Sequence, residues 1–246
     1  MNKIAHTSFI KTQSKVNEKI RKLLSKPDFQ QLVRKFDCIL IDILDNNVSI
    51  PFEDKQFFAD QIEAIKFQNK FSFFKNGITN IHPYKDVTVS QLYEVIAKGY
   101  LAKKTELLRT TKETDLKKFK KLKSNLPYVT FSGTFKLRNN DSLIKHSGLY
   151  CMDIDNVSEP DKLKNSISGI EDQYFETELI FTSPSGQGLK WVIYLPPNNY
   201  SHRENFLGIR NYVKDRYKIT VDNTPDVARA CFICHDPECY INPRLL

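Results

Sequence analysis

The C-terminal half of the chain alternates between strand-like and helix-like patterns of apolar residues. Apolar runs bounded by turn residues predict four strands, at 149–155, 177–183, 189–195 and 230–236. Apolar positions at helical spacing predict one helix that follows residues 158–161 and a second over 202–217. The resulting order, β-α-β-β-α-β, is that of a split βαβ or ferredoxin-like fold. We therefore predict an α+β protein with an RRM-like sheet.

The first 147 residues predict a less regular arrangement. Residues 14–36 show helical spacing, and a short amphipathic helix is predicted after a polar N-cap at Thr88 or Ser90. The segment 126–135, LPYVTFSGTF, predicts a strand that enters a Ser-Gly turn. We predict three parts, a mainly helical region at 1–80, an α+β module with a basic segment at 81–147, and the RRM-like module at 148–246.

The predicted topology has the sheet order 4-1-3-2, with antiparallel neighbours and both helices on one face. The first strand then lies between the third and the fourth. Its end carries Asp153 and Asp155, which would lie beside Lys190 on the third strand and Arg229 at the start of the fourth. The predicted fold therefore brings three polar features of the sequence to one edge of the sheet.

Two carboxylates end the first predicted strand, in the sequence GLYCMDIDN. Side chains alternate along a strand, so Asp153 and Asp155 point the same way, about 7 Å apart. Like charges this close repel each other unless a positive group lies between them. Taken alone, such a pair is also typical of a solvated strand end or of an aspartate that caps a helix.

The turn 183–188, SPSGQG, is longer and richer in glycine than a tight hairpin requires. Gly186 and Gly188 permit positive φ angles and let backbone N–H groups approach an anion. Lys190 follows, and strand alternation places it on the open face if Trp191 packs beneath the helices. The segment resembles a phosphate cradle, with an ordinary hairpin turn as the alternative. It lacks the G-x-x-x-x-G-K-[ST] pattern of a P-loop, so no ATPase motor is predicted.

Further charged residues precede the fourth predicted strand, in VDNTPDVARACF. Asp222 or Asp226 would add a third carboxylate to the pair and complete a site for two divalent cations that prefer oxygen ligands. Arg229 could hold a phosphate with two hydrogen bonds. The alternative is a surface loop in which Asp226 and Arg229 pair with each other.

Three segments, LYCMDIDN, FTSPSGQGLKWVIY and VDNTPDVARACFICHDP, together resemble the primase-like domain of the archaeo-eukaryotic primase superfamily. The similarity is to the bacterial mobile-element branch described as VirE N-terminal or primase–polymerase-like. It implies an RRM-like catalytic sheet packed against an N-terminal α+β module, with 81–246 as one primase-like domain. It also implies template-dependent transfer of nucleotides from NTPs or dNTPs.

The first motif of that family, D-h-D, falls on Asp153 and Asp155, which the resemblance implies as catalytic metal ligands. The second motif falls on the turn and implies that the incoming triphosphate is bound by Ser183, Ser185, Gly186, Gly188 and Lys190. The third falls on Asp222, with Asp226 as its rival, and Arg229 would contact phosphate. This chain departs from many family members in having Lys190 where they have His.

The net charge of +8 is concentrated between residues 103 and 123, which hold nine Lys or Arg residues against three acids. The segment suggests a polyanionic partner, nucleic acid rather than membrane, because no large apolar face accompanies the charge. We predict that it binds a single-stranded DNA template, above all through Lys117, Lys118, Lys120 and Lys121. A solvated helix face is the alternative.

The sequence shows no sign of membrane insertion or secretion. It has no run of about 18 apolar residues, and its N-terminus lacks the apolar core of a signal peptide. Five cysteines at irregular spacing suit a reducing compartment. We therefore predict a cytoplasmic protein without a membrane segment.

Two other patterns bear on metal chemistry. The C-x2-C-H-x3-C sequence at 231–239 has residue types suited to zinc. Cys231 and Cys234 would point to opposite faces of a strand, however, so we predict buried free cysteines. The five histidines include no H-x-H pair, which disfavours a rolling-circle nickase.

The leading hypothesis is a DNA primase or primase–polymerase nucleotidyltransferase that adds nucleotides on a single-stranded template. Two Mg²⁺ or Mn²⁺ ions held by Asp153, Asp155 and a third carboxylate would support in-line attack of a 3′-hydroxyl on the α-phosphate. A helicase domain or a separate helicase is a further expected partner. The alternatives are another metal-dependent nucleotide enzyme, such as a cyclase or a phosphodiesterase, and a non-catalytic nucleic-acid-binding module.

Overall fold

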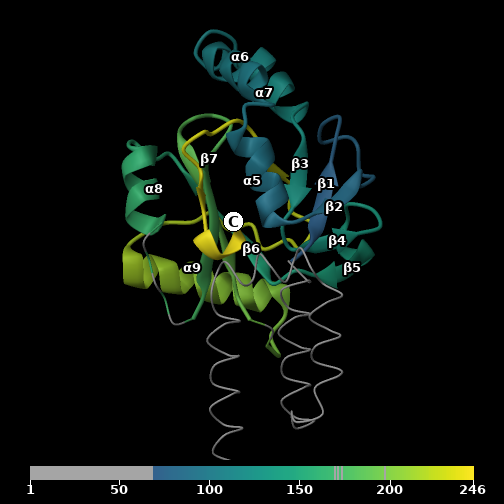
Figure 1. Cartoon of the computed structure of the whole chain (residues 1–246), viewed down its shortest axis with the longest axis vertical. Helices are drawn as coiled ribbons and strands as arrows, with labels where there is room; N and C mark the ends of the chain where they lie inside the picture. Colours follow the sequence, from purple (N-terminus) through teal and green to yellow (C-terminus); the bar gives the residue numbers. More distant parts are fainter. Residues whose placement is uncertain (1–68, 169, 171, 173, 197) are drawn as a thin grey trace, which may run out of the picture. The chain divides into compact units, whose positions relative to one another are not determined.

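The computed structural model describes residues 69–246, except for residues 169, 171, 173 and 197. The chain divides into two compact units, one of which is Asn69–Asn242 (Figure 1). The short 3-10 helix η2 (Pro243–Leu245) belongs to the other unit. The predicted helical segment 14–36 lies outside the described residues. None of the helices in the described part of the chain is long and apolar enough to cross a membrane.

The first sheet of the unit Asn69–Asn242 has four antiparallel strands. Their order in space is β2 (Lys85–Val87), β1 (Phe71–Phe74), β3 (Tyr128–Thr130) and β9 (Cys231–Phe232). Buried aromatic rings join these strands, and the ring of Phe74 stacks on that of Tyr128 at 4.5 Å between centroids. A separate hairpin, β4 (Gly133–Phe135) with β5 (Leu143–His146), follows β3 in the sequence.

The second sheet contains the strands predicted in the C-terminal half. Its order is β10 (Tyr240–Ile241), β7 (Glu176–Thr182), β8 (Gly188–Tyr194) and β6 (Leu149–Asp155), again antiparallel throughout. β6 therefore forms an edge of this sheet. The predicted strands at 149–155, 177–183 and 189–195 are confirmed within one residue, and so is the pairing of the first with the third.

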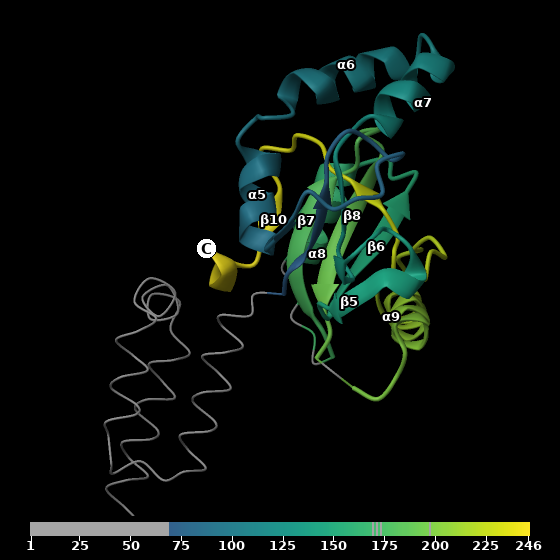
Figure 2. The same ribbon diagram turned by 90° about the vertical axis from the view of Figure 1, so that its right-hand side faces the viewer.

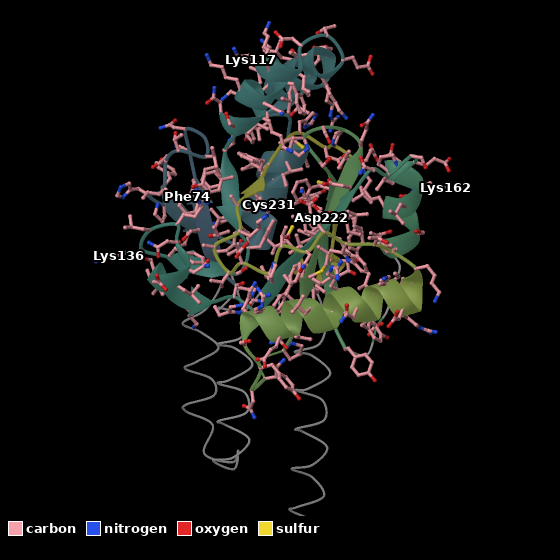
Figure 3. The ribbon with its side chains drawn as sticks, turned by 180° about the vertical axis from the view of Figure 1, so that it is seen from behind. Phe74, Lys117, Lys136, Lys162, Asp222 and Cys231 are labelled. Carbon is pink, nitrogen blue, oxygen red and sulfur yellow. The ribbon has the colours of Figure 1, made fainter. Side chains whose placement is uncertain are left out.

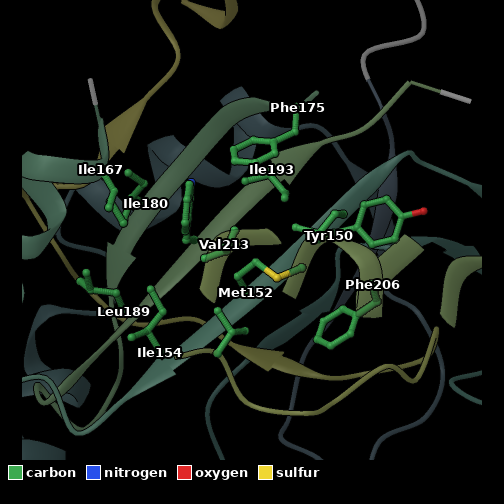
Figure 4. Packing of buried hydrophobic residues seen from close by; sticks show 13 residues of the cluster. Tyr150, Met152, Ile154, Ile167, Phe175, Ile180, Leu189, Ile193, Phe206 and Val213 are labelled. Carbon is green, nitrogen blue, oxygen red and sulfur yellow. The ribbon is translucent and has the colours of Figure 1, made fainter. Parts of the chain in front are cut away.

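Helices α8 (Pro160–Ser168) and α9 (His202–Tyr217) cover one face of the second sheet (Figure 4). Strand alternation sends Met152 and Ile154 of β6 to this face, where Trp191 is also fully buried. α9 begins at Ser201, whose hydroxyl accepts from the backbone N–H of Glu204 in a capping box. Burial of this apolar face leaves the opposite side chains of β6, including Asp153 and Asp155, on the other side of the sheet.

Three further helices lie N-terminal to β3 in the sequence, α5 (Val89–Ala97), α6 (Ala102–Lys112) and α7 (Leu116–Ser124). Thr88 caps α5 with a capping box to Gln91, which confirms one of the two predicted N-caps. α5 contacts β7 and β10, on the side of the second sheet away from α9 (Figure 2). The basic segment 103–123 therefore forms two helices, packed on each other through Leu108 and Phe119.

The mixed α+β class is confirmed, but the predicted place of the fourth strand was wrong. β9 spans only two residues and pairs with β3 of the first sheet, whereas β10 occupies the second sheet beside β7. The ring of Phe232 meets that of Tyr128 on β3 edge-on at 6.1 Å, an aromatic contact that supports this pairing. β6 is consequently not central, and the face that carries Asp153 is not open.

A buried ion pair ties α8 to the segment that follows β9. Lys164 Nζ lies 3.1 Å from Asp236 Oδ2, and the two side chains are 3% and 7% exposed. Asp236 also accepts hydrogen bonds from the backbone N–H groups of Thr182, at 2.7 Å, and Glu238, at 3.1 Å. This one carboxylate therefore joins three segments that are far apart in the sequence.

Candidate functional site

The acid pair lies on β6 opposite the start of β8. Asp153 is the register partner of Lys190 and Asp155 that of Gly188. Lys190 Nζ forms an ion pair with Asp153 Oδ2, and both side chains are largely buried. The other carboxylate oxygen, Asp153 Oδ1, is buried without a hydrogen-bond partner. Leaving a buried acceptor unpaired costs free energy. Binding of a cation or a hydrogen-bond donor to this oxygen would therefore be favourable.

Lys190 carries its charge despite its burial. Burial acts to lower the pKa of Lys190, but the surrounding acidic groups, Cys231 and Asp153 first among them, raise it above its usual value. The Lys190 ammonium therefore partly neutralises the carboxylate cluster at neutral pH.

Asp222 joins the acid pair from the loop after α9. Its backbone N–H donates to the carbonyl oxygen of Asp153 at 2.9 Å, which fixes the loop against the edge strand. Partial burial raises the pKa of Asp222, and the charges of Asp155 and Asp153 raise it further. The structure thus brings Asp222, one of the two candidates for the third carboxylate, to Asp153 and Asp155.

A small pocket of about 20 Å³ opens beside Asp153, with room for roughly one group the size of a water molecule or an ion. Asp226 and Arg229 line it together with Asp153 and Lys190. Arg229 reaches the site although β9 does not pair with β6, because the two strands meet at the 3.8 Å contact between Cys151 Sγ and Cys231 Sγ. Figure 3 labels Asp222 and Cys231 among the side chains of the unit.

The turn 183–188 passes directly beside the acid cluster. A Cβ atom at Gly188 would come within 2.6 Å of the carbonyl oxygen of Ile154, so only glycine permits this approach of β8 to β6. Two amides of the turn are already used, since Gly186 N–H donates to Ser183 O and Ser183 N–H to Gly188 O. The Ser183 and Ser185 hydroxyls lie 3.0 Å apart. These two amides are therefore not available to a phosphate at this turn.

Sequence reasoning missed Arg109 and Lys112 as neighbours of this turn. Arg109 Nη2 donates a long hydrogen bond of 3.4 Å to the carbonyl oxygen of Ser183, and Lys112 Nζ contacts the side-chain oxygen of Gln187. Both belong to the basic segment, where only the total charge was interpreted. Helical spacing does place them on one face, three residues apart, but nothing in the sequence identifies what that face contacts.

The structure also pairs two histidines that are 56 residues apart. His146 Nε2 lies 2.8 Å from His202 Nδ1, and the ring of Tyr150 stacks on that of His202 at 4.8 Å. Gly148 N–H donates to His146 Nδ1, so the neutral ring of His146 must carry its proton on Nε2 and donate to His202. His202 Nε2 then faces the Ser132 hydroxyl at 3.5 Å. His202 and Ser132 both line the pocket.

We expect this histidine pair to make the protein less stable in acid. Burial lowers the pKa of His146, and burial together with neighbouring His146 lowers that of His202 to about 4. Between about pH 6.5 and 4 the unfolded chain binds protons that the folded chain does not, so stability falls as pH falls, by up to about 3 kcal/mol. Urea unfolding at several pH values measures this slope.

The matched control for this measurement is the exposed His82. The double variant His146→Gln/His202→Gln should flatten the acid slope between pH 6.5 and 4, whereas His82→Gln should leave it unchanged. A slope that survives in the double variant would assign the acid sensitivity to other groups.

The cysteines of the C-x2-C-H-x3-C sequence are buried free thiols, as predicted. Cys234 Sγ lies against the carbonyl oxygen of Thr182, while Cys231 Sγ meets Cys151, so the two point to different neighbours. Within residues 69–246, outside the four gaps, no three His, Cys, Asp or Glu side chains are grouped so that they could hold a metal ion as they lie. A metal at the acid cluster would therefore require the carboxylates to adjust around it.

The four lysines predicted to bind a template lie on α7 and are exposed. Phe119 points inward and Asp115 caps the first turn by accepting from the Lys118 N–H at 2.9 Å. Figure 3 shows Lys117 on the α6–α7 pair, away from the labelled Asp222. The basic segment thus has two parts: Arg109 and Lys112 contact the turn, and the α7 lysines face solvent.

The chain is similar to one described protein family. The family model for the BT4734-like N-terminal domain matches residues 121–241, just under half of the chain. No curated protein and no solved structure matches the chain. The matched stretch contains the acid pair, the turn 183–188 and Arg229, whereas Arg109 lies outside it. Over the residues that carry the carboxylate cluster, the chain is therefore similar to the N-terminal domain of BT4734-like proteins.

Proposed function

We propose that the protein is a nucleotidyltransferase of the primase or primase–polymerase type, which adds nucleotides on a single-stranded DNA template. One observation carries this proposal. Three carboxylates converge at the edge strand β6 around a buried carboxylate oxygen without a partner, while Lys190 and Arg229 line the same pocket. Clustered carboxylates with flanking cations suit a reaction that brings divalent ions and phosphates together.

The donor set fits hard divalent cations. Asp153, Asp155 and Asp222 offer only oxygen ligands, which Mg²⁺ and Mn²⁺ prefer, and Asp226 lines the adjoining pocket. Burial raises the pKa of Asp222, and so do the charges of Asp155 and Asp153, a repulsion that a cation would relieve. Bound divalent ions would supply activation of the 3′-hydroxyl and stabilisation of the departing pyrophosphate.

The cationic side chains are placed to receive the triphosphate of an NTP or dNTP. Lys190 now pairs with Asp153; once a cation satisfies that carboxylate, the Lys190 ammonium is available for a phosphate oxygen. Arg229 is exposed at the mouth of the pocket and can offer its guanidinium fork. The pocket itself is too small for a nucleotide, so the triphosphate would lie across its opening.

The local fold agrees with this proposal. The order β6-α8-β7-β8-α9, with both helices on one face, supports an RRM-like arrangement for the catalytic sheet. No described strand pairs with β6 on its outer side, and the loop with Asp222 lies along that edge instead. A template and a primer would therefore reach the carboxylates beside this loop, without displacing a strand.

The proposal is tested by primer extension. Purified protein, a primed single-stranded DNA template, and NTPs or dNTPs are incubated with Mn²⁺ or Mg²⁺, and products are resolved by length. Extension that depends on the template supports the proposal. Pyrophosphate release without a template would indicate a cyclase-type reaction instead, and metal-independent DNA binding without any product would indicate a binding module.

Template binding should depend on the exposed lysines of α7. Neutralising Lys117, Lys118, Lys120 and Lys121 together should reduce the slope of log affinity against log salt by up to about 3, because each phosphate contact on a single strand contributes about 0.7. Fluorescence anisotropy with labelled single-stranded DNA at several salt concentrations measures the slope.

A second quadruple variant controls for the overall loss of charge. It neutralises four other exposed lysines of the unit, Lys136, Lys162, Lys214 and Lys218. This variant has the same net charge as the α7 variant, so its slope should remain close to that of the wild type. Equal slopes in the two variants would mean that α7 is only a solvated face.

A further inference from the structure

Helix α6 is fixed firmly against the unit on one side. The backbone N–H of His235 donates to the buried hydroxyl of Thr105 on α6 at 2.8 Å, and His235 Nδ1 also lies 2.9 Å from the carbonyl oxygen of Ile96 on the preceding helix α5. Leu108, fully buried, packs with Phe119 at the interface with α7. The position of α6 is therefore set by contacts that do not involve its charged residues.

Arg109 lies one helical turn after Thr105 and so projects from the same, inward side of α6. Its guanidinium rests against the glycine turn, where a Cβ atom at Gly186 would be 3.4 Å from Arg109 Nε. Gly186 has a φ of +77°, a conformation that favours glycine, so the turn presents bare backbone to the arginine. Lys112 adds a second cation beside Gln187 of the same turn.

The hydrogen bonding of Arg109 is incomplete. Its Nε is buried without an acceptor, and its one direct bond to the turn is the long contact to Ser183. A guanidinium presents five donors in a planar fork, so most of its capacity is unused here. Among the described residues, no carboxylate forms an ion pair with Arg109. A cation in this state lacks a counter-ion, and phosphate oxygens match its geometry.

We propose that Arg109, supported by Lys112, binds the terminal phosphates of the incoming nucleotide against the turn 183–188 and thereby couples the α6–α7 helix pair to nucleotide binding. This inference rests on the proposed function. It assigns to the basic segment a second role besides template contact, and it supplies the side-chain donors that the turn needs because two of its amides are already used.

The site is tested with inorganic tripolyphosphate and with a dNTP, each titrated by calorimetry in the presence of Mn²⁺. Arg109→Gln should weaken both by about tenfold or more, the usual effect of losing a charge-assisted hydrogen bond. Arg109→Lys keeps the charge but loses the fork and should give an intermediate affinity. Affinity for single-stranded DNA should change less than twofold in both variants.

Lys104→Ala is the matched control, since it removes a positive charge from the exposed side of the same helix. Its affinity for tripolyphosphate should equal that of the wild type. Thermal melting of each variant verifies folding, and Arg109→Lys keeps the test valid if Arg109→Gln unfolds.

The outcomes separate the inference from the proposed function. If the wild type binds tripolyphosphate and extends primers while both Arg109 variants bind it equally well, the role of Arg109 is refuted and the function stands. If the wild type binds tripolyphosphate but forms no product, the function fails, and a loss of binding in Arg109→Gln still assigns the anion site. If the wild type binds neither tripolyphosphate nor the dNTP, the anion site is overturned, and primer extension decides the proposed function separately.

Discussion

Asp153→Asn should reduce primer extension by about 10³-fold or more in a chain that still folds, although with a lower free energy of unfolding because Lys190 loses its partner. The substitution preserves size and removes one negative charge at the point where a cation would replace the ion pair with Lys190. Loss of a carboxylate ligand to a catalytic divalent ion removes several kcal/mol of transition-state stabilisation. Extension rates at saturating template measure the loss of activity, and circular dichroism shows whether the variant is folded.

Asp215→Asn serves as the control for this prediction, because Asp215 is an exposed acid on α9. It should extend primers at the wild-type rate. Calorimetry provides a second readout: the double variant Asp153→Asn/Asp155→Asn should lose Mn²⁺ binding. Unchanged Mn²⁺ affinity in the double variant would refute the assignment of the acid pair as metal ligands.

Lys164→Met should lower the free energy of unfolding by about 3–5 kcal/mol. The change leaves Asp236 buried, charged and without its ion-pair partner, which is far more costly than losing an exposed pair. Asp236→Asn should have an effect at least as large, because Asp236 also accepts two backbone hydrogen bonds. Urea denaturation followed by circular dichroism gives the values.

The exposed pair Lys162–Glu159 on the same helix region is the comparison for this stability prediction. Lys162→Met should change the free energy of unfolding by less than about 1 kcal/mol. If Lys164→Met is as mild as Lys162→Met, the interior around Asp236 must admit water, and the pair does not hold α8 in place.

Several helices and strands could be predicted from the sequence because the signals for them lie within each segment. The strand at 149–155, the helix at 202–217 and the N-cap at Thr88 follow from periodicity and capping residues within each segment. The partner of the last strand could not be read in this way. It depends on the contact of Phe232 with Tyr128, and no local pattern specifies a contact between residues more than 100 positions apart.

The same difference between local signals and long-range contacts holds for the candidate site. Asp153, Asp155 and Asp222 lie together as predicted, since the short motif places the pair and the loop after α9 returns to it. Arg109 and the histidine pair were missed. Arg109 was one positive charge among nine, and His146 and His202 become neighbours only when the β4–β5 hairpin meets the start of α9.

The position of β6 at the edge of its sheet also affects how the protein behaves at high concentration. An edge strand offers its free backbone groups to the edge of another molecule, and charged side chains along the strand discourage such pairing. On β6 that charge comes from the exposed Asp155, and the exposed Asp222 lies on the loop against the same edge. The carboxylates that we propose for catalysis therefore also oppose self-association. Neutralising them should lower the solubility of the protein as well as its activity.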